Sequence, residues 1–383
     1  MTQAVTQTSG WQLELSADEQ AENQLAKHAI HVHKFGGTSL ATPECILRVV
    51  EIIQQNCQLN DIVVVSANGK TTDQLFALYS LASSLKTEKT DAESSLNEEN
   101  QTVTQALAEL HTSQITLINR LLKPSYAKQL ATALAHDFEQ LTIWLKDDLA
   151  HHHNDILGFG EIWSARLLSA LLNEKVCPSN SIDSRDFVVI DNEQNCSVDQ
   201  SLSAAKLKQR RQFGKLAVTT GYICQDAQGL TCTLGRNGSD YSATIIASLV
   251  AALNVTLWTD VDGIYSADPR VVPNARKLHR LPNGVAKELG RLGNPVLHAK
   301  TLIPLVNESI DHHCHLHVAS SFDAQVTGTE IGKFGQIAKQ ELSVTYLNDL
   351  LLVQSNCFVG EILIKIQREF TPIWIDDKQA QLV

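Results

Sequence analysis

The hydrophobic positions of this chain change repeatedly between two spacings. An alternating apolar segment over residues 30–35 predicts a first β-strand, and an apolar run over residues 61–67 predicts a second, buried strand. Thr42 and Pro43 suit the N-cap and the first position of a helix between them. One face of that helix is predicted by four apolar residues at i, i+3, i+4 and i+7: Ile46, Val49, Val50 and Ile53.

Residues 86–104 are acidic and polar, and they lie within a mostly helical insert that is predicted to run to about residue 149. Gly158 and Gly160 are predicted to break this insert, so that Glu161 opens the next helix. The insert is therefore expected to be an addition to a regular α/β pattern.

Further strands are predicted over residues 216–220 and 231–234, which flank Gly221 and Gly229 as strands joined by a turn, and over residues 255–259. Strands that alternate with helices form mostly parallel sheets with both faces covered. The expected fold class is α/β, a three-layer αβα sandwich.

Candidate chemistry first appears where the first strand ends. Lys34 precedes Gly36 and Gly37, and Thr38 and Ser39 follow. Glycines allow a tight turn that brings backbone N–H groups close to a ligand, and the helix that follows favours an anion at its start. The segment predicts a phosphate site, although a plain strand-to-helix turn has the same appearance. It is not a Walker motif, because the lysine comes before the glycines.

A second polar segment follows residues 231–234. Gly235 and Gly238 flank Arg236, and Ser239 and Asp240 begin an amphipathic helix. Arginine binds a carboxylate through two parallel hydrogen bonds, and an aspartate can orient a lysine or bind Mg²⁺ near phosphate oxygens. The alternative is a capped helix with a surface arginine.

The third segment follows the strand predicted over residues 255–259. Thr259 and Asp260 end that strand at the carboxyl edge, where open α/β sheets bind ligands. Tyr265, Asp268 and Arg270 follow a turn and provide an aromatic ring, an acid and a base. A nucleotide needs such a set, although a solvated hairpin also resembles it.

In this order, the three segments resemble the aspartokinases of the amino-acid kinase family over residues 31–332, and most closely the kinase half of bifunctional aspartokinase/homoserine dehydrogenase II. The resemblance implies the amino-acid kinase or carbamate kinase-like fold and transfer of the ATP γ-phosphoryl group to L-aspartate, giving 4-phospho-L-aspartate. The residues that match the family's motifs include Lys34-Phe-Gly-Gly-Thr-Ser39, Ser66-Ala67 with Thr72, Gly160-Glu161, Leu234-Gly-Arg-Asn-Gly-Ser-Asp-Tyr241, Trp258-Thr-Asp-Val-Asp-Gly-Ile-Tyr265, Asp268-Pro-Arg270 and Val296-Leu-His298.

The resemblance also implies roles for these residues. Lys34 and Asp240 are expected to be catalytic. Mg-ATP is expected as nucleotide and cofactor, without a dedicated protein cage for the metal. The residues expected to bind aspartate are Ser66, Thr72, Glu161, Arg236 and Ser239. The residues expected to bind phosphate or nucleotide are Lys34, Gly36, Gly37, Thr38, Ser39, Thr259, Asp260, Tyr265 and Arg270.

One position departs from the family pattern. The family usually has a lysine three residues before His298, and Pro295 occupies that position here. This departure supports one alternative to aspartate kinase, a weakened or non-catalytic kinase-fold regulatory module. A second alternative is a different amino-acid kinase that acts on glutamate or acetylglutamate, which would share the fold and the Lys-x-Gly-Gly turn.

The predicted domains are a polar leader over residues 1–29, a catalytic domain over residues 30–335 and the start of an ACT-like βαβ region over residues 340–383. We expect that this region is truncated and that a fused homoserine dehydrogenase domain is absent. A homodimer or larger assembly is expected from the family. The regulatory amino acid is left open.

Composition limits the remaining classes. The formal net charge of −11 argues against a nucleic-acid surface, and no apolar run reaches the length of a membrane span. Eight cysteines without a C-x-x-C spacing favour reduced thiols, so a cytoplasmic location is expected. The histidine runs at 151–153 and 312–317 lack zinc-site spacing, and we expect a solvated loop and an edge strand there.

Overall fold

The computed structural model describes residues 29–87, 93–147, 149–191, 197–294, 296–306 and 314–334, together with short strands at 353–354, 375–376 and 381–382. The predicted leader, apart from Ala29, lies outside the described residues, and so does Pro295.

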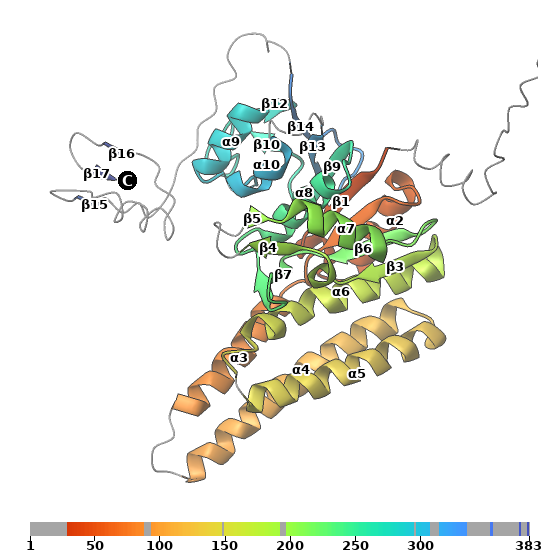
Figure 1. Cartoon of the computed structure of the whole chain (residues 1–383), viewed down its shortest axis with the longest axis vertical. Coiled ribbons are helices and arrows are strands. Elements are labelled where there is room, and N and C mark those ends of the chain that lie inside the picture. Colours follow the sequence, from red (N-terminus) through yellow and green to blue (C-terminus); the bar gives the residue numbers. More distant parts are fainter. Residues whose placement is uncertain are drawn as a thin grey trace, which may run out of the picture.

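An eight-stranded sheet forms the centre of the molecule, in the order β12-β14-β13-β9-β1-β2-β6-β3 (Figure 1). Every neighbouring pair is parallel except β13 with β14. The predicted mostly parallel sheet is therefore confirmed. The strands are β1 (His31–Phe35), β2 (Ile62–Val65), β3 (Ser179–Ile182), β6 (Leu216–Thr220), β9 (Asn254–Thr259), β12 (Arg280–Pro282), β13 (His315–Ser320) and β14 (Thr329–Gly332).

Helices cover both faces of the sheet. On β2, Val63 and Val65 belong to one apolar core, whereas Ile62 and Val64 belong to the other, because successive side chains of a strand point to opposite faces. The first core contains α2 (Pro43–Asn56), α3 (Thr71–Thr87), α4 (Glu93–Leu121), α5 (Pro124–Lys146) and α6 (His153–Lys175). The second contains α7 (Gln200–Arg210), α8 (Gly238–Leu249), α9 (Asn283–Arg291) and α10 (Ala299–Val306). None of the helices in the described ranges is long and apolar enough to cross a membrane.

The predicted helix after β1 begins as expected. The Thr42 hydroxyl accepts a hydrogen bond from the Cys45 N–H at 3.2 Å, and Pro43 is the first helical residue. The predicted helical insert consists of the far part of α3 with α4 and α5, which project from the sheet as antiparallel helices (Figure 1).

The prediction of a break at Gly158 and Gly160 is wrong, because both lie inside α6, which begins at His153. A Cβ atom at Gly158 would lie 3.2 Å from Ile223, and one at Gly160 would lie 2.7 Å from the Cβ of Ala67. The two glycines therefore let α6 pack closely against the side chains of Ile223 and Ala67. Glu161 is consequently an interior helix residue.

Residues 216–220 and 231–234 are strands, but no single turn joins them. The intervening β7 (Ile223–Asp226) forms a hairpin with β8 (Thr231–Thr233) in a second sheet of order β5-β4-β7-β8. That sheet also contains β4 (Val189–Asp191) and β5 (Ser197–Val198). The strand β7 was not predicted from the sequence.

The expected edge strand near the second histidine run is also wrong, because β13 lies between β14 and β9. His315 and Glu330 on β14 come within 3.3 Å. Among the described residues, no group of three or more His, Cys, Asp or Glu side chains is arranged to hold a metal ion.

Three short strands lie in the region expected to be ACT-like. β15 (Val353–Gln354) and β16 (Ile375–Asp376) each pair antiparallel with β17 (Gln381–Leu382). The helix expected between the first two strands falls outside the described residues. The ACT-like character of this region stays a prediction.

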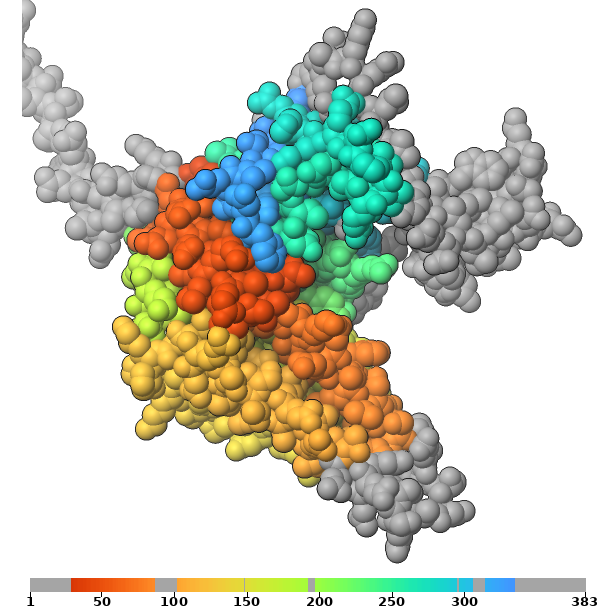
Figure 2. Space-filling model, turned by 180° about the vertical axis from the view of Figure 1, so that it is seen from behind, coloured from red at the N-terminus to blue at the C-terminus, as the bar shows by residue number. Residues whose placement is uncertain are grey.

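Figure 2 shows the earliest described residues, in red and orange, packed beside the blue segment near residue 320. The Ser39 and Ser321 hydroxyls lie 2.7 Å apart in this contact. The turn after β1 is thereby fixed to the segment that follows β13.

Candidate active site

The candidate active site lies at the carboxyl edge of the sheet. Phe35 is in register with Val65 on one side and with Trp258 on the other, so β1, β2 and β9 end side by side. β6 pairs with β2 and ends at the same level, with Val65 opposite Thr220. The segments that follow these strands therefore meet, although they are far apart in the sequence.

Lys34 and Asp240 form an ion pair at this edge. The Lys34 Nζ lies 2.6 Å from an Asp240 carboxylate oxygen, and the side chains are 11% and 18% exposed. Asp240 occupies the first turn of α8, behind Asn237, whose φ of 56° lies in the left-handed region. The end of β1 and the start of α8 thus place the two predicted catalytic residues in contact.

The glycine turn after β1 depends on a close backbone contact. A Cβ at Gly37 would lie 3.1 Å from the carbonyl oxygen of Ala67 and 3.2 Å from that of Gly69. The Gly69 N–H donates to the Gly37 carbonyl at 3.1 Å. A Cβ at Gly36 would lie 3.3 Å from the Lys34 Nζ, so glycine leaves room for the ammonium group.

A cavity of about 980 Å³ opens over these segments. Its lining includes both members of the ion pair and most of the residues predicted to bind nucleotide: Lys34, Gly36, Gly37, Thr38, Asp240, Thr259, Asp260, Tyr265 and Arg270. Ser39 is not among the lining residues, because its side chain is buried against Ser321.

A loop over residues 260–270 forms one wall of this cavity. The Tyr265 hydroxyl donates to Asp262 at 2.9 Å, and the Lys277 ammonium donates to the other Asp262 oxygen at 2.7 Å. Burial acts against ionisation of Asp262, but these hydrogen bonds hold its pKa below the usual value. Arg270 makes a bidentate contact with Asp268, at 3.0 and 2.8 Å.

Glu161 lies on α6, beneath the segment that follows β2. Its side chain is 3% exposed, and its Oε1 accepts the Ala67 N–H at 3.3 Å. Burial raises its pKa to about 8. Its Oε2 has no hydrogen-bond partner among the described residues. Thr72 lies beside the same turn of α6, since a Cβ at Gly160 would lie 3.5 Å from its hydroxyl.

Arg236, Ser239 and Tyr222 lie at the start of α8. Arg236 is exposed, whereas Ser239 is buried. A Cβ at Gly221 would lie 2.6 Å from the Cβ of Ser239, so the turn after β6 packs directly on α8. Burial raises the pKa of Tyr222, which hydrogen-bonds Thr233 and is close enough to Glu161 for that carboxylate to add to the shift.

His298 lies near the same helix start. Burial lowers its pKa, the neighbouring positive charges of Lys300 and Arg236 lower it further, and Asp240 opposes the shift. Arg236 and Asp240 therefore lie within electrostatic reach of one imidazole.

The predicted residues thus form two adjoining groups. Those expected to bind nucleotide line the cavity, except Ser39. Those expected to bind aspartate surround Glu161 and the start of α8 instead, and are absent from the cavity lining: Ser66, Thr72, Glu161, Arg236 and Ser239. Gly37, Ala67 and Gly69 connect the two groups.

Sequence reasoning missed Lys277 and Tyr222. Lys277 lies on β11 (Lys277–Leu278), which pairs with β10 (Ile264–Tyr265), so only that pairing brings it to Asp262. Tyr222 has a φ of 64°, which is unusual for a residue other than glycine. The preceding Gly221 at a strand end was the available signal.

Known proteins resemble this chain in sequence and in fold. The profile of the amino acid kinase family matches residues 29–319. The chain is 39% identical over 326 residues to bifunctional aspartokinase/homoserine dehydrogenase 2 of Escherichia coli, covering 84% of this chain and 38% of that protein. It is 29% identical over 358 residues to lysine-sensitive aspartokinase 3 of E. coli, covering 87% of this chain and 72% of that protein.

Among solved structures, E. coli aspartokinase III in complex with aspartate and ADP has a similar fold, with a TM-score of 0.73 and 24% identity. The match covers 92% of this chain and 77% of that chain. The resemblance expected from the sequence is confirmed, although the chain spans only 38% and 32% of the length of the bifunctional relatives from E. coli and Zea mays. The chain belongs to the amino acid kinase family.

Proposed function

We propose that the chain is an aspartate kinase, which transfers the γ-phosphoryl group of ATP to the side-chain carboxylate of L-aspartate. The observation that carries this proposal is the position of Glu161. Glu161 is a buried carboxylate, and one of its oxygens has no hydrogen-bond partner among the described residues. Gly37, Ala67 and Gly69 connect it to a cavity lined by a lysine and a glycine turn. Such a carboxylate suits the α-ammonium group of an amino acid, because an opposite charge offsets its desolvation.

The residues support a mechanism based on alignment and charge. A carboxylate oxygen of aspartate attacks the γ-phosphorus, and the bond to the oxygen that bridges the β- and γ-phosphorus atoms breaks to release ADP. The nucleophile is already ionised at neutral pH, so no strong base is needed. Lys34, oriented by Asp240, stabilises the oxygens of the transferring group, and the N–H groups of Gly36 and Gly37 add donors.

The amino acid is bound by its two α-substituents. Glu161 binds the ammonium group and Arg236 binds the α-carboxylate through two hydrogen bonds, with Ser66, Thr72 and Ser239 around them. Thr259, Asp260, Tyr265 and Arg270 bind the nucleotide. Mg²⁺ would come with ATP, and the cavity carboxylates Asp240 and Asp260 suit its preference for oxygen. When bound, the metal would neutralise part of the phosphate charge.

A broader set of properties belongs to the same proposal. These are a first step towards lysine, threonine and methionine, an ACT-like regulatory region, fusion to a homoserine dehydrogenase domain, a dimeric or larger assembly and a cytoplasmic location. The similarity to bifunctional aspartokinase/homoserine dehydrogenase 2 supports the fusion, and the other properties are what the resemblance to aspartokinases implies.

An assay of ADP release tests the proposal. With Mg-ATP, L-aspartate is expected to stimulate ADP formation, whereas L-glutamate and N-acetyl-L-glutamate are not. Stimulation by either glutamate compound alone would assign a different amino-acid kinase. No stimulation by any of them would favour a non-catalytic module.

A further inference from the structure

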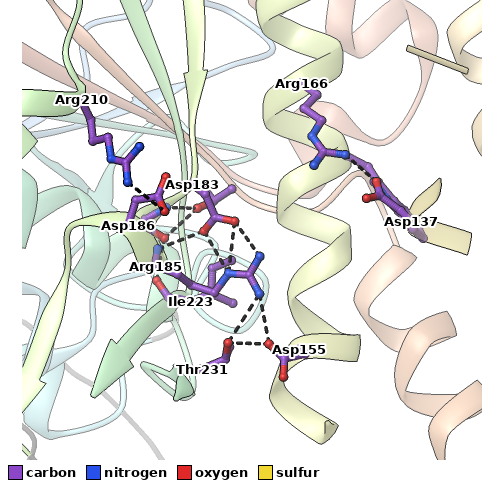
Figure 3. A network of polar contacts seen from close by, with 12 residues as sticks. Asp137, Asp155, Arg166, Asp183, Arg185, Asp186, Arg210, Ile223 and Thr231 are labelled. Carbon is purple, nitrogen blue, oxygen red and sulfur yellow. Dashed lines mark hydrogen bonds and ion pairs between the residues drawn. The ribbon is translucent and has the colours of Figure 1, made fainter. Parts of the chain in front are cut away.

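A cluster of polar side chains joins the first turn of α6 to strand β8. It consists of Asp155 on α6, Asp183 and Arg185 at η2 (Ser184–Asp186), and Thr231 on β8 (Figure 3). The Arg185 Nε lies 3.1 Å from each Asp183 oxygen, and one terminal nitrogen lies 2.7 Å from Asp183. The other terminal nitrogen donates to Asp155 at 3.1 Å. We call these four residues the Arg185 cluster.

Thr231 is held to α6 through both its side chain and its backbone. Its hydroxyl donates to the same Asp155 oxygen at 2.5 Å, and the Asn154 side-chain amide donates to its carbonyl at 3.0 Å. Hydrogen bonds to charged groups are about twice as strong as neutral ones. Asp155 also lies in the first turn of α6, where the helix dipole favours an anion.

One of the elements joined by this cluster carries Glu161, and another leads to Arg236, which are the two proposed charge ligands of the amino acid. Glu161 lies on α6, six residues after Asp155, about 9 Å along the helix axis. Arg236 lies five residues after Thr231, in the connection between β8 and α8 and three residues beyond the end of β8. Tyr222 lies near both elements, since it hydrogen-bonds Thr233 on β8 and the Glu161 carboxylate adds to the rise in its pKa.

We infer that Arg185 is a positioning residue for amino-acid binding, because it fixes the separation between Glu161 and Arg236. This inference rests on the proposed function. It does not touch the substrate itself. A displacement of one charge ligand by about 1 Å is expected to weaken the grip on the ammonium and carboxylate groups. The nucleotide cavity contains no member of the cluster, so nucleotide binding should change little.

The other side of α6 provides a matched control. Arg166 and Trp163 both donate hydrogen bonds to Asp137 on α5. Figure 3 shows the contact between Arg166 and Asp137. This contact anchors α6 to the helical insert and does not involve β8. Arg210, which pairs with Asp186 at 3.6 Å, is a second control within the same view.

The test compares Arg185→Met and Thr231→Val with Arg166→Met and Arg210→Met in the ADP-release assay, with melting temperatures. Arg185→Met is expected to raise KM for L-aspartate on the order of ten-fold and to leave KM for ATP and kcat within about two-fold. Thr231→Val should raise KM for L-aspartate less than Arg185→Met does. Arg185→Lys keeps a positive charge and should also raise this KM less than Arg185→Met does. Arg166→Met is expected to lower the melting temperature without this selective change, and Arg210→Met should be neutral.

Four results would overturn the inference. Equal increases in both KM values for Arg185→Met would indicate general damage, and a selective increase for Arg166→Met would indicate that any loss of α6 packing suffices. If the wild type is active and Arg185→Met has an unchanged KM for L-aspartate, only the positioning role is overturned. A wild type without aspartate-dependent ADP release overturns the proposed function, and the positioning role with it.

Discussion

Lys34 is the residue on which the proposed chemistry depends most. Its ammonium group is largely buried, has Asp240 as its ion-pair partner at 2.6 Å, and lies at the edge of a cavity that opens between β1 and α8. A cation held in this way is oriented before any ligand binds. Preorganised charge of this kind stabilises charge that develops in the transition state without further rearrangement.

Removal of this charge should slow the chemical step. Lys34→Met keeps the length of the side chain but not the ammonium group. We expect kcat to fall by about 10²-fold or more, the scale for loss of one preorganised donor, with a smaller change in KM for aspartate. Steady-state kinetics measure both constants. A turnover number within a few-fold of wild type would exclude Lys34 from the mechanism.

Substitutions of the exposed residues Arg236 and Arg270 should affect the KM values for aspartate and ATP differently. Lysine cannot make a bidentate contact, so Arg236→Lys should raise KM for aspartate more than KM for ATP. Arg270 lines the nucleotide cavity, and Arg270→Lys should show the opposite preference. Measurement of both KM values in both variants checks the assignment. Equal effects on the two substrates would place Arg236 outside the amino-acid pocket.

Glu161 predicts a specific pH dependence of stability. Burial raises its pKa from 4.5 to about 8, so between these values the folded chain keeps a proton that the unfolded chain has released. Because the folded state binds more protons, this group lowers stability as pH rises through that window. Glu161→Gln does not titrate, so its melting temperature should rise relative to wild type from about pH 5 to about pH 8. A difference that stays constant with pH would show that Glu161 is ionised in the free protein.

At the scale of elements, the course of helix α6 could not be predicted from local sequence patterns. Its glycines suggested a break, yet Gly158 and Gly160 are interior residues that permit contact with Ile223 and Ala67. The periodic elements on either side were predictable, because strand and helix spacings are local properties. A glycine required by packing is not distinguishable from a helix breaker until the neighbouring element is known.

In the candidate site, residues at strand ends were predictable from the sequence, whereas contacts between distant segments were not. Residues at the carboxyl ends of predicted parallel strands, such as Lys34 and Thr259, meet because neighbouring strands end together. Lys277 was not predictable, since only the pairing of β10 with β11 brings it to Asp262. The side chain of Ser39 turns away to Ser321, and no local pattern indicated that contact.

Close packing of α6 can be tested with a pair of glycine substitutions. Gly160→Ala would put a methyl group 2.7 Å from the Cβ of Ala67 and push α6 away from the N–H that contacts Glu161. We expect a loss of about 1–3 kcal/mol in the free energy of unfolding, although alanine favours helix, together with a higher KM for aspartate. Denaturant titration measures the first quantity.

Gly284→Ala in α9 is the matched control, because none of the described residues outside its own turn of the helix comes within 4 Å of the added methyl group. It should be neutral or stabilising by about 0.4–1 kcal/mol. A stable Gly160→Ala protein with unchanged kinetics would show that α6 can shift without effect on the amino-acid pocket.

At the scale of the whole molecule, the sheet separates two apolar cores and gathers the polar segments at one edge. The nucleotide cavity and the region around Glu161 meet across the turn formed by Gly37, Ala67 and Gly69. This arrangement would bring an amino-acid carboxylate towards a terminal phosphate beside Lys34. The product expected from the proposed function is therefore an acyl phosphate of aspartate.

Hydroxylamine trapping detects an acyl phosphate of aspartate, because hydroxylamine converts an acyl phosphate into a stable hydroxamate. With Mg-ATP and L-aspartate, we predict that aspartyl hydroxamate accumulates in step with ADP. We predict none with L-glutamate, and none above background for Lys34→Met. ADP formation without hydroxamate, or equal hydroxamate from Lys34→Met, would contradict phosphoryl transfer to the aspartate carboxylate at this site.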